Sequence, residues 1–179
     1  DSCATPQVLP NGASTPAYDT TSATTDGVGD EGCLAVGADN IGNDVWFSWE
    51  PTSSGFWRFS TCGDTSDTKL AIYAPQACPP VAPLACQDDE CGLQSSLYAD
   101  VVTGTTYLLR VGNFPGTTGG AGTLAITPAG PAPPEDDCAT PFVVPPASLP
   151  QAIPFDITLG SHSGPPEPTC FFFGTDLFA

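Results

Sequence analysis

The opening of the chain recurs near its end, and this internal repeat is the strongest constraint on how the sequence can fold. Residues 1–6 read DSCATP and residues 136–141 read DDCATP. Further along, Tyr18-Asp19-x-Thr21 matches Phe155-Asp156-x-Thr158, Cys33 matches Cys170, and Gly37-x-Asp39 matches Gly174-x-Asp176. A period of this length is that of a whole domain rather than a solenoid unit. We therefore expect one complete module over residues 1–127 and the N-terminal part of a second, incomplete module over residues 136–179.

The second copy lacks the strands that would complete it. Residues 136–179 contain no counterpart of Asp44-Val45-Trp46-Phe47, which opens the most apolar strand of the first module. We expect the missing strands to come from further chain beyond Ala179 or from another molecule. Residues 128–135, between the copies, are Pro-rich and predict a stiff, extended linker.

Composition indicates an extracellular or cell-surface protein. Eight cysteines without metal-ligand spacing predict disulfides, which persist in oxidising compartments. Twenty acidic residues face three basic ones, for a net charge of −17, which excludes nucleic acid as a natural partner. No apolar run approaches the roughly 20 residues of a membrane span. The surplus carboxylates are candidates for binding a hard cation such as Ca²⁺.

The sequence predicts that the first module is an all-β, antiparallel β-sandwich stapled by disulfides. Short stretches of alternating apolar and polar residues are separated by Gly- and Pro-rich turns. These stretches are residues 44–50, 55–61, 69–74, 94–102, 105–111 and 122–127. Their number and spacing favour two packed sheets.

The repeat suggests a disulfide pairing. The second copy keeps only the counterparts of Cys3 and Cys33, so the simplest inference pairs Cys3 with Cys33 and Cys138 with Cys170. Neighbour pairing of the other four cysteines gives Cys62–Cys78 and Cys86–Cys91. The second of these bonds would close the acidic loop at residues 87–90.

An ordered set of motifs over residues 40–127 resembles the bacterial pre-peptidase C-terminal domain in its cysteine-bearing variants. The motifs are Asp44–Phe47, Ser60–Gly63, Asp67–Tyr73, Ala85–Asp89 with Gly92–Leu97, and Gly104–Gly112. The resemblance implies a jelly-roll-like sandwich on secreted or surface proteins, typically non-catalytic and often in tandem. Some members bind Ca²⁺ or extracellular matrix, and the family has no universal active site to transfer.

Acidic residues supply the candidate metal site. Asp88 and Asp89 lie in the loop after Cys86, and Asp67 opens a strand that could run beside it, so these three are the predicted calcium ligands. The alternative is that Asp67 and Asp88 accept backbone hydrogen bonds in turns. A second acidic group surrounds Cys33 and comprises Asp26, Asp30, Glu31, Asp39 and Asp44.

The sequence gives little indication of a catalytic site. The single histidine, His162, has the non-basic counterpart Thr25 in the first module, and it lacks an evident acid and oxyanion partner. The aromatic residues Trp46, Phe56, Trp57, Phe59 and Trp49 could form a carbohydrate platform, but their alternation favours burial of most of them.

We therefore expect a non-catalytic structural or adhesive repeat of an extracellular filament, surface layer or long surface protein. Its partners would be copies of itself or adjacent repeats, and also extracellular matrix or polysaccharide. The alternative is an accessory matrix- or carbohydrate-binding domain of a secreted peptidase or glycosidase. A catalytic domain elsewhere in the polypeptide would favour this alternative, whereas further copies of the Asp-x-Cys-Ala-Thr-Pro motif would favour the structural role.

Overall fold

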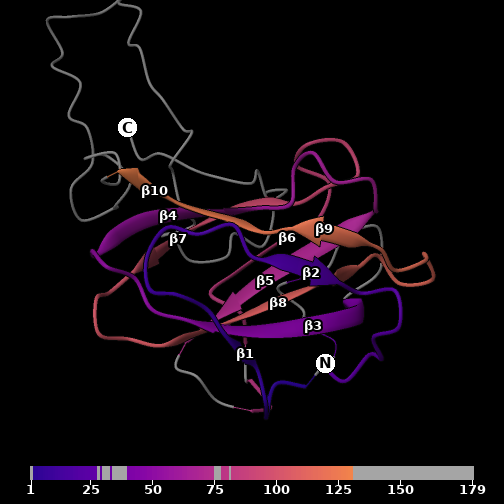
Figure 1. The fold of residues 1–179 in the computed structure, drawn as a ribbon, viewed down its shortest axis with the longest axis horizontal. Helices are drawn as coiled ribbons and strands as arrows, with labels where there is room; N and C mark the ends of the chain where they lie inside the picture. Colours follow the sequence, from indigo (N-terminus) through magenta and orange to yellow (C-terminus); the bar gives the residue numbers. More distant parts are fainter. Residues whose placement is uncertain are drawn as a thin grey trace, which may run out of the picture. The chain divides into compact units, whose positions relative to one another are not determined.

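The computed structural model describes residues 2–27, 29, 33, 40–74, 78–80 and 82–130. In this part of the chain, β-strands are joined by turns and loops (Figure 1). The strands are β1 (Gln7–Val8), β2 (Ala17–Asp19), β3 (Gly42–Trp49), β4 (Gly55–Ser60), β5 (Thr68–Tyr73), β6 (Ala85–Gln87), β7 (Ser96–Val101), β8 (Tyr107–Asn113), β9 (Ala121–Thr123) and β10 (Ala125–Gly130). The predicted all-β fold is confirmed.

Two sheets form the sandwich. One has five strands in the order β1-β3-β8-β5-β6, and the other has three in the order β10-β4-β7. Figure 1 shows β10, β4 and β7 together in the upper part of the view and β3, β5 and β8 below them. β1 pairs with β3 in parallel, whereas the pairs β3–β8, β5–β8, β5–β6 and β4–β7 are antiparallel. A short antiparallel ribbon of β2 and β9 accompanies the two sheets.

Strand alternation explains the main core. In β3, Phe47 and Trp49 face inward together with Val45, and they meet Trp57 and Phe59 from β4. The Trp49 ring contacts the Phe59 ring edge-on, with centroids 5.2 Å apart. All five aromatic residues considered for a carbohydrate platform are buried, so the prediction that most of them belong to the interior is confirmed.

A second apolar cluster lies on the outer face of the five-stranded sheet. Trp46, Ala71, Tyr73 and Leu108 point away from the main core and pack with Ile41. Cys3, Cys33 and Cys86 belong to the same cluster. Parts of the N-terminal segment therefore cover this face, and the sheet is buried on both sides here.

The disulfides differ from the predicted pairing. The bonds are Cys3–Cys78, Cys33–Cys86 and Cys62–Cys91. The predicted bonds Cys3–Cys33, Cys62–Cys78 and Cys86–Cys91 are therefore wrong. The oxidised state of these six cysteines agrees with the prediction, whereas Cys138 and Cys170 lie outside the described residues.

Topology explains why neighbour pairing fails. Cys3 and Cys33 belong to the segment that covers the outer face, and their partners come from that face: Cys86 lies in β6, and Cys78 lies between β5 and β6. Cys62 follows β4 and Cys91 precedes β7, and these two strands pair with Ser60 opposite Ser96. The repeat misled the inference because residues 136–179 hold counterparts of the covering segment but none of the strands that it covers.

The chain divides into two units, Asp1–Ala129 and Gly130–Ala179. The first corresponds to the sandwich described above. Residues 131–179, which include most of the predicted linker and all of the predicted second copy, lie outside the described residues, so the domain boundaries and the incomplete repeat stay predictions. Within the described part of the chain, no helix is long and apolar enough to cross a membrane.

Candidate functional site: a buried acidic cluster

Three aspartates lie close together at one end of the pair formed by β5 and β6. Asp67 immediately precedes β5, while Asp88 and Asp89 immediately follow β6. Because β5 and β6 run antiparallel, with Leu70 opposite Gln87, the start of one strand lies beside the end of the other. Residues that are 21 positions apart in the sequence thus become neighbours.

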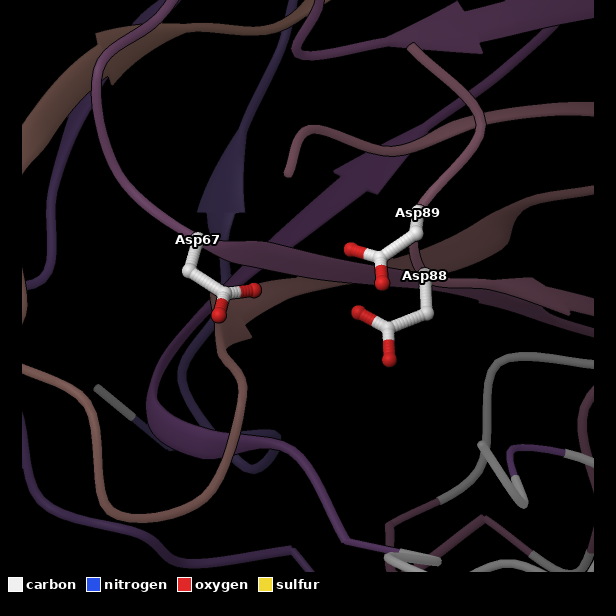
Figure 2. Close-up of side chains that lie close together, drawn as sticks. All are labelled: Asp67, Asp88 and Asp89. Atoms are coloured by element: carbon white, nitrogen blue, oxygen red, sulfur yellow. The ribbon is translucent and has the colours of Figure 1, made fainter. Parts of the chain in front are cut away.

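The three carboxylates face a common point. One oxygen from each side chain lies within 4.8 Å of those from the other two. Figure 2 shows Asp67 on one side and Asp88 and Asp89 on the other, with their carboxylates turned toward the space between them. Asp88 is buried, Asp67 is half-buried and Asp89 is exposed, so the cluster reaches from solvent into the protein. The structure brings together the three residues that the sequence nominated.

Several of these oxygens are buried without a hydrogen-bond partner. Asp88 is only 4% exposed, and both of its carboxylate oxygens lack a partner among the described residues, as does Oδ1 of Asp67. Buried polar atoms in proteins almost always have such a partner. The alternative in which Asp88 stabilises a turn through backbone hydrogen bonds is therefore wrong.

Burial dominates the electrostatics of the cluster. Burial raises the pKa of Asp88 to about 6, with the charges of Asp89 and Asp67 adding to the rise and Lys69 opposing it. The pKa of Asp67 is raised by burial and then by the charge of Asp89, again against the effect of Lys69. The positive charge of Lys69 thus compensates only part of the negative charge of the three aspartates.

Lys69 is itself buried and engaged elsewhere. Its ammonium donates a hydrogen bond of 2.7 Å to the backbone oxygen of Cys33 and lies 5.7 Å from the centre of the Phe114 ring. The sequence alone does not indicate that Lys69 is buried. Its burial and its hydrogen bond to Cys33 depend on the segment that covers the outer face of the sheet.

The loop that carries Asp88 and Asp89 is held on both sides. The Cys62–Cys91 bond ties it to the end of β4, and the backbone nitrogens of Glu90 and Cys91 donate to the oxygen of Gln94. Behind it, the Ser95 nitrogen donates to the hydroxyl oxygens of Thr61 and Thr68, at 3.0 Å each. This buried polar network fixes the loop beside the start of β5, and the sequence did not reveal it.

The second acidic group has structural roles where the structure describes it. Asp44 is fully buried and paired with Arg110. Asp26 accepts a 2.7 Å hydrogen bond from the indole nitrogen of Trp46. Burial acts to raise the pKa of Asp26, but the bond from Trp46 and other hydrogen bonds outweigh it and lower that pKa overall. Asp30, Glu31, Asp39 and His162 lie outside the described residues.

Three carboxylates supply only oxygen ligands. Such a set suits a hard cation, and Ca²⁺ takes six to eight oxygens in flexible geometry. The described part of the chain offers this one group of three or more acidic, histidine or cysteine side chains with metal-binding spacing.

Comparison with known proteins identifies no family for this chain. No family model matches the chain, and no curated protein matches it. Among solved structures, the chain is similar to PliG of Aeromonas hydrophila, a periplasmic inhibitor of g-type lysozyme, at 8% identity and a TM-score of 0.37. That alignment covers 69% of this chain and 100% of PliG. The resemblance to the pre-peptidase C-terminal domain stays a prediction, whereas the three disulfides indicate an oxidising compartment outside the cytoplasm.

Proposed function

We propose that this chain is a non-catalytic structural or adhesive module of an extracellular protein, and that its β-sandwich recurs head to tail in a filament, surface layer or long surface protein. The proposal combines the fold with the repeated N-terminal segment. Its partners are copies of the same module, joined through the segment that opens each copy.

The part played by the first 20 residues in the sandwich carries this proposal. β1 joins the edge of β3, and β2 pairs with β9. Leu9 and Tyr18 are buried in the main core, and Cys3 is bonded to Cys78. The opening segment is therefore an integral part of a folded module that depends on strands from much later in the chain.

The second copy repeats this dependent segment. Phe155 corresponds to the buried Tyr18, and Cys138 to the bonded Cys3. Residues 136–179 contain no counterparts of β3 to β10, and a fragment of this size cannot bury its apolar side chains alone. We propose that strands of an adjacent module receive it by strand addition. A contact of this head-to-tail kind, repeated, produces a linear array.

Two further features favour this role over carbohydrate binding. The aromatic side chains nominated for a sugar platform are buried, so they offer no stacking surface. Three disulfides fasten the covering segment and the acidic loop to the sheets, as suits a domain that must endure outside the cell.

The test compares residues 1–130 with the full chain by light scattering and electron microscopy. We expect the shorter protein to be monomeric and the full chain to form concentration-dependent linear assemblies. Phe155→Asp should abolish assembly, because it places a charge where Tyr18 is buried in the first copy. Asp156→Asn is the matched control, since its counterpart Asp19 is exposed. If the full chain stays monomeric with residues 136–179 resistant to protease, assembly fails and the accessory-domain role replaces it.

A further inference from the structure

We propose that Asp67, Asp88 and Asp89 form a Ca²⁺ site that links the start of β5 to the loop after β6. The inference does not depend on the proposed assembly, because it concerns only residues of the first module. It rests on the spacing of the three carboxylates and on the unpartnered state of the buried ones.

The unpartnered oxygens require an explanation. Asp88 is 4% exposed, both of its oxygens lack a hydrogen-bond partner among the described residues, and its carboxylate is turned toward Asp67 (Figure 2). A buried carboxylate without a partner is costly unless it is neutralised by a proton, an opposite charge or a metal ion. A divalent cation between the carboxylates satisfies all the unpartnered oxygens at once.

Lys69 is a weaker explanation for the same atoms. Its ammonium is committed to the Cys33 carbonyl, 2.7 Å away. Neither oxygen of Asp88 receives a hydrogen bond from it or from any other described residue.

The spacing fits a single ion. Two oxygens bound to the same Ca²⁺ lie at most about 5.2 Å apart, twice the longest usual Ca–O distance. One oxygen from each of the three aspartates already meets this limit, at 4.8 Å or less. The three carboxylates supply up to six oxygens if all bind through both, and solvent reaches the site beside the exposed Asp89 to complete the shell.

The chemistry favours calcium over other metals. The ligands are all oxygen, which disfavours zinc and copper, because these metals prefer nitrogen or sulfur. Mg²⁺ requires a near-ideal octahedron with bonds of about 2.0–2.1 Å, whereas Ca²⁺ accepts irregular, longer coordination. The ligands here come from two separate segments with unequal exposure, which matches the more tolerant ion.

A cation at this position would act as a further cross-link. Asp67 belongs to the connection between β4 and β5, while Asp88 and Asp89 belong to the loop fastened by Cys62–Cys91. An ion that binds only the folded state stabilises that state by mass action. Calcium would thus adjust the stability of the sheet edge according to the concentration of the ion outside the cell.

The test is calorimetric titration of the full chain with Ca²⁺ alone after treatment with chelator, together with melting curves. We expect the unmodified protein to bind Ca²⁺ and to melt at a higher temperature in its presence. Asp88→Asn and Asp67→Asn should each remove this site and its thermal shift. The control is Asp100→Asn, which makes the same charge change at an exposed position of β7 and should bind as the unmodified protein does.

Asp89→Asn separates binding from folding, because Asp89 is exposed. This variant should bind Ca²⁺ at least about tenfold more weakly, since affinity depends on the number of charged ligands. Its melting temperature in chelator should be no lower than that of the unmodified protein, because the change removes a negative charge beside the buried Asp67 and Asp88. Unchanged Ca²⁺ binding in Asp88→Asn or Asp89→Asn would overturn the proposal, as would the absence of binding by the unmodified protein at millimolar Ca²⁺.

Discussion

The Asp44 carboxylate accepts a 2.7 Å hydrogen bond from Nε of Arg110, and both side chains are completely buried on the outer face of the five-stranded sheet. The bulge in β3 between Gly42 and Val45 places Asp44 at this point. Asn43 has a φ of 45° there, a left-handed conformation that asparagine tolerates better than most residues. The guanidinium also donates to the Ile41 oxygen and lies 5.2 Å from the Trp46 ring.

Breaking this pair should destabilise the module strongly. We expect Asp44→Ala to lower the free energy of unfolding by about 3–5 kcal/mol, because it removes the Asp44 carboxylate that pairs with the buried Arg110 guanidinium. Denaturant unfolding gives the value, with Asp100→Ala as an exposed control that should change it by less than about 0.5 kcal/mol. A loss below 1 kcal/mol for Asp44→Ala would mean that water or another group compensates Arg110.

The disulfide connectivity yields a second prediction. Peptide mapping without reduction should recover Cys3–Cys78, Cys33–Cys86 and Cys62–Cys91. Replacing Cys33 and Cys86 together by serine should cost about 2–5 kcal/mol, since this bond closes a long loop and fastens the covering segment. Recovery of a Cys3–Cys33 peptide would contradict the structure and restore the pairing inferred from the repeat.

The same connectivity bears on the second copy. Cys138 and Cys170 are the counterparts of Cys3 and Cys33, which do not bond to each other in the first module. We therefore expect Cys138 and Cys170 not to bond to each other either, but to pair with cysteines equivalent to Cys78 and Cys86 in the strands that complete the second copy. Mapping of the native assembly tests this, and a Cys138–Cys170 bond within one chain would show that the two copies are fastened differently.

Long strands were predictable from the sequence because they carry their own pattern. β3, β4, β5, β7 and β8 each have six or more residues with alternation or strong apolar content. β1, β2 and β6 have only two or three residues, too few for a periodicity to be detected. β1 and β6 form the edges of the five-stranded sheet and β2 pairs with the short β9, so these strands depend on partners that the topology brings beside them.

The candidate site was predictable in its residues but not in its environment. Asp67, Asp88 and Asp89 could be nominated because strand ends and acidic loops are visible in the sequence. The burial of Lys69 and Arg110 was not visible, because it depends on the segment that covers the outer face, in which Ile41 lies 69 residues from Arg110 and Cys33 lies 36 residues from Lys69. The cysteine pairing failed for the same reason, since it follows from which surfaces meet in space.

Tyr18 gives a prediction at alkaline pH. Its hydroxyl donates to Asp64 at 2.7 Å, and burial, then this hydrogen bond and the charge of Asp64, raise the pKa of Tyr18 well above its usual value. The folded state therefore keeps a proton that the unfolded state loses above pH ~10. Stability should fall as the pH rises beyond that point, because the folded state binds more protons.

Ultraviolet absorbance of tyrosinate measures this effect. In the folded protein Tyr18 should not ionise until the module unfolds. Tyr18→Phe should leave the tyrosinate signal of the folded protein unchanged and reduce that of the denatured protein by one of its four tyrosines. At pH 7 it should cost about 0.5–1.5 kcal/mol through the lost hydrogen bond. A smaller tyrosinate signal in the folded variant would show that Tyr18 ionises within the native state.

Without calcium, Asp88→Asn should stabilise the module at neutral pH. The pKa of Asp88 is raised by burial to about 6 from 3.8, so its ionisation opposes folding at pH 7, and this effect is lost as the pH falls below 3.8. One pKa unit corresponds to about 1.4 kcal/mol, which sets the gain for the variant in chelator at up to about 3 kcal/mol. The charges of Asp67, Asp89 and Lys69 also act on Asp88, and these residues are unchanged in the variant.

Unfolding of both proteins in chelator at pH 7 and near pH 3 measures this gain. The advantage of Asp88→Asn should shrink toward zero at the lower pH, where Asp88 is largely protonated in both states. Millimolar Ca²⁺ at pH 7 should reduce or reverse the advantage, because only the unmodified protein can bind the ion. Asp100→Asn should show neither effect. A variant that is less stable than the unmodified protein in chelator would mean that the Asp88 carboxylate supports the fold without any cation.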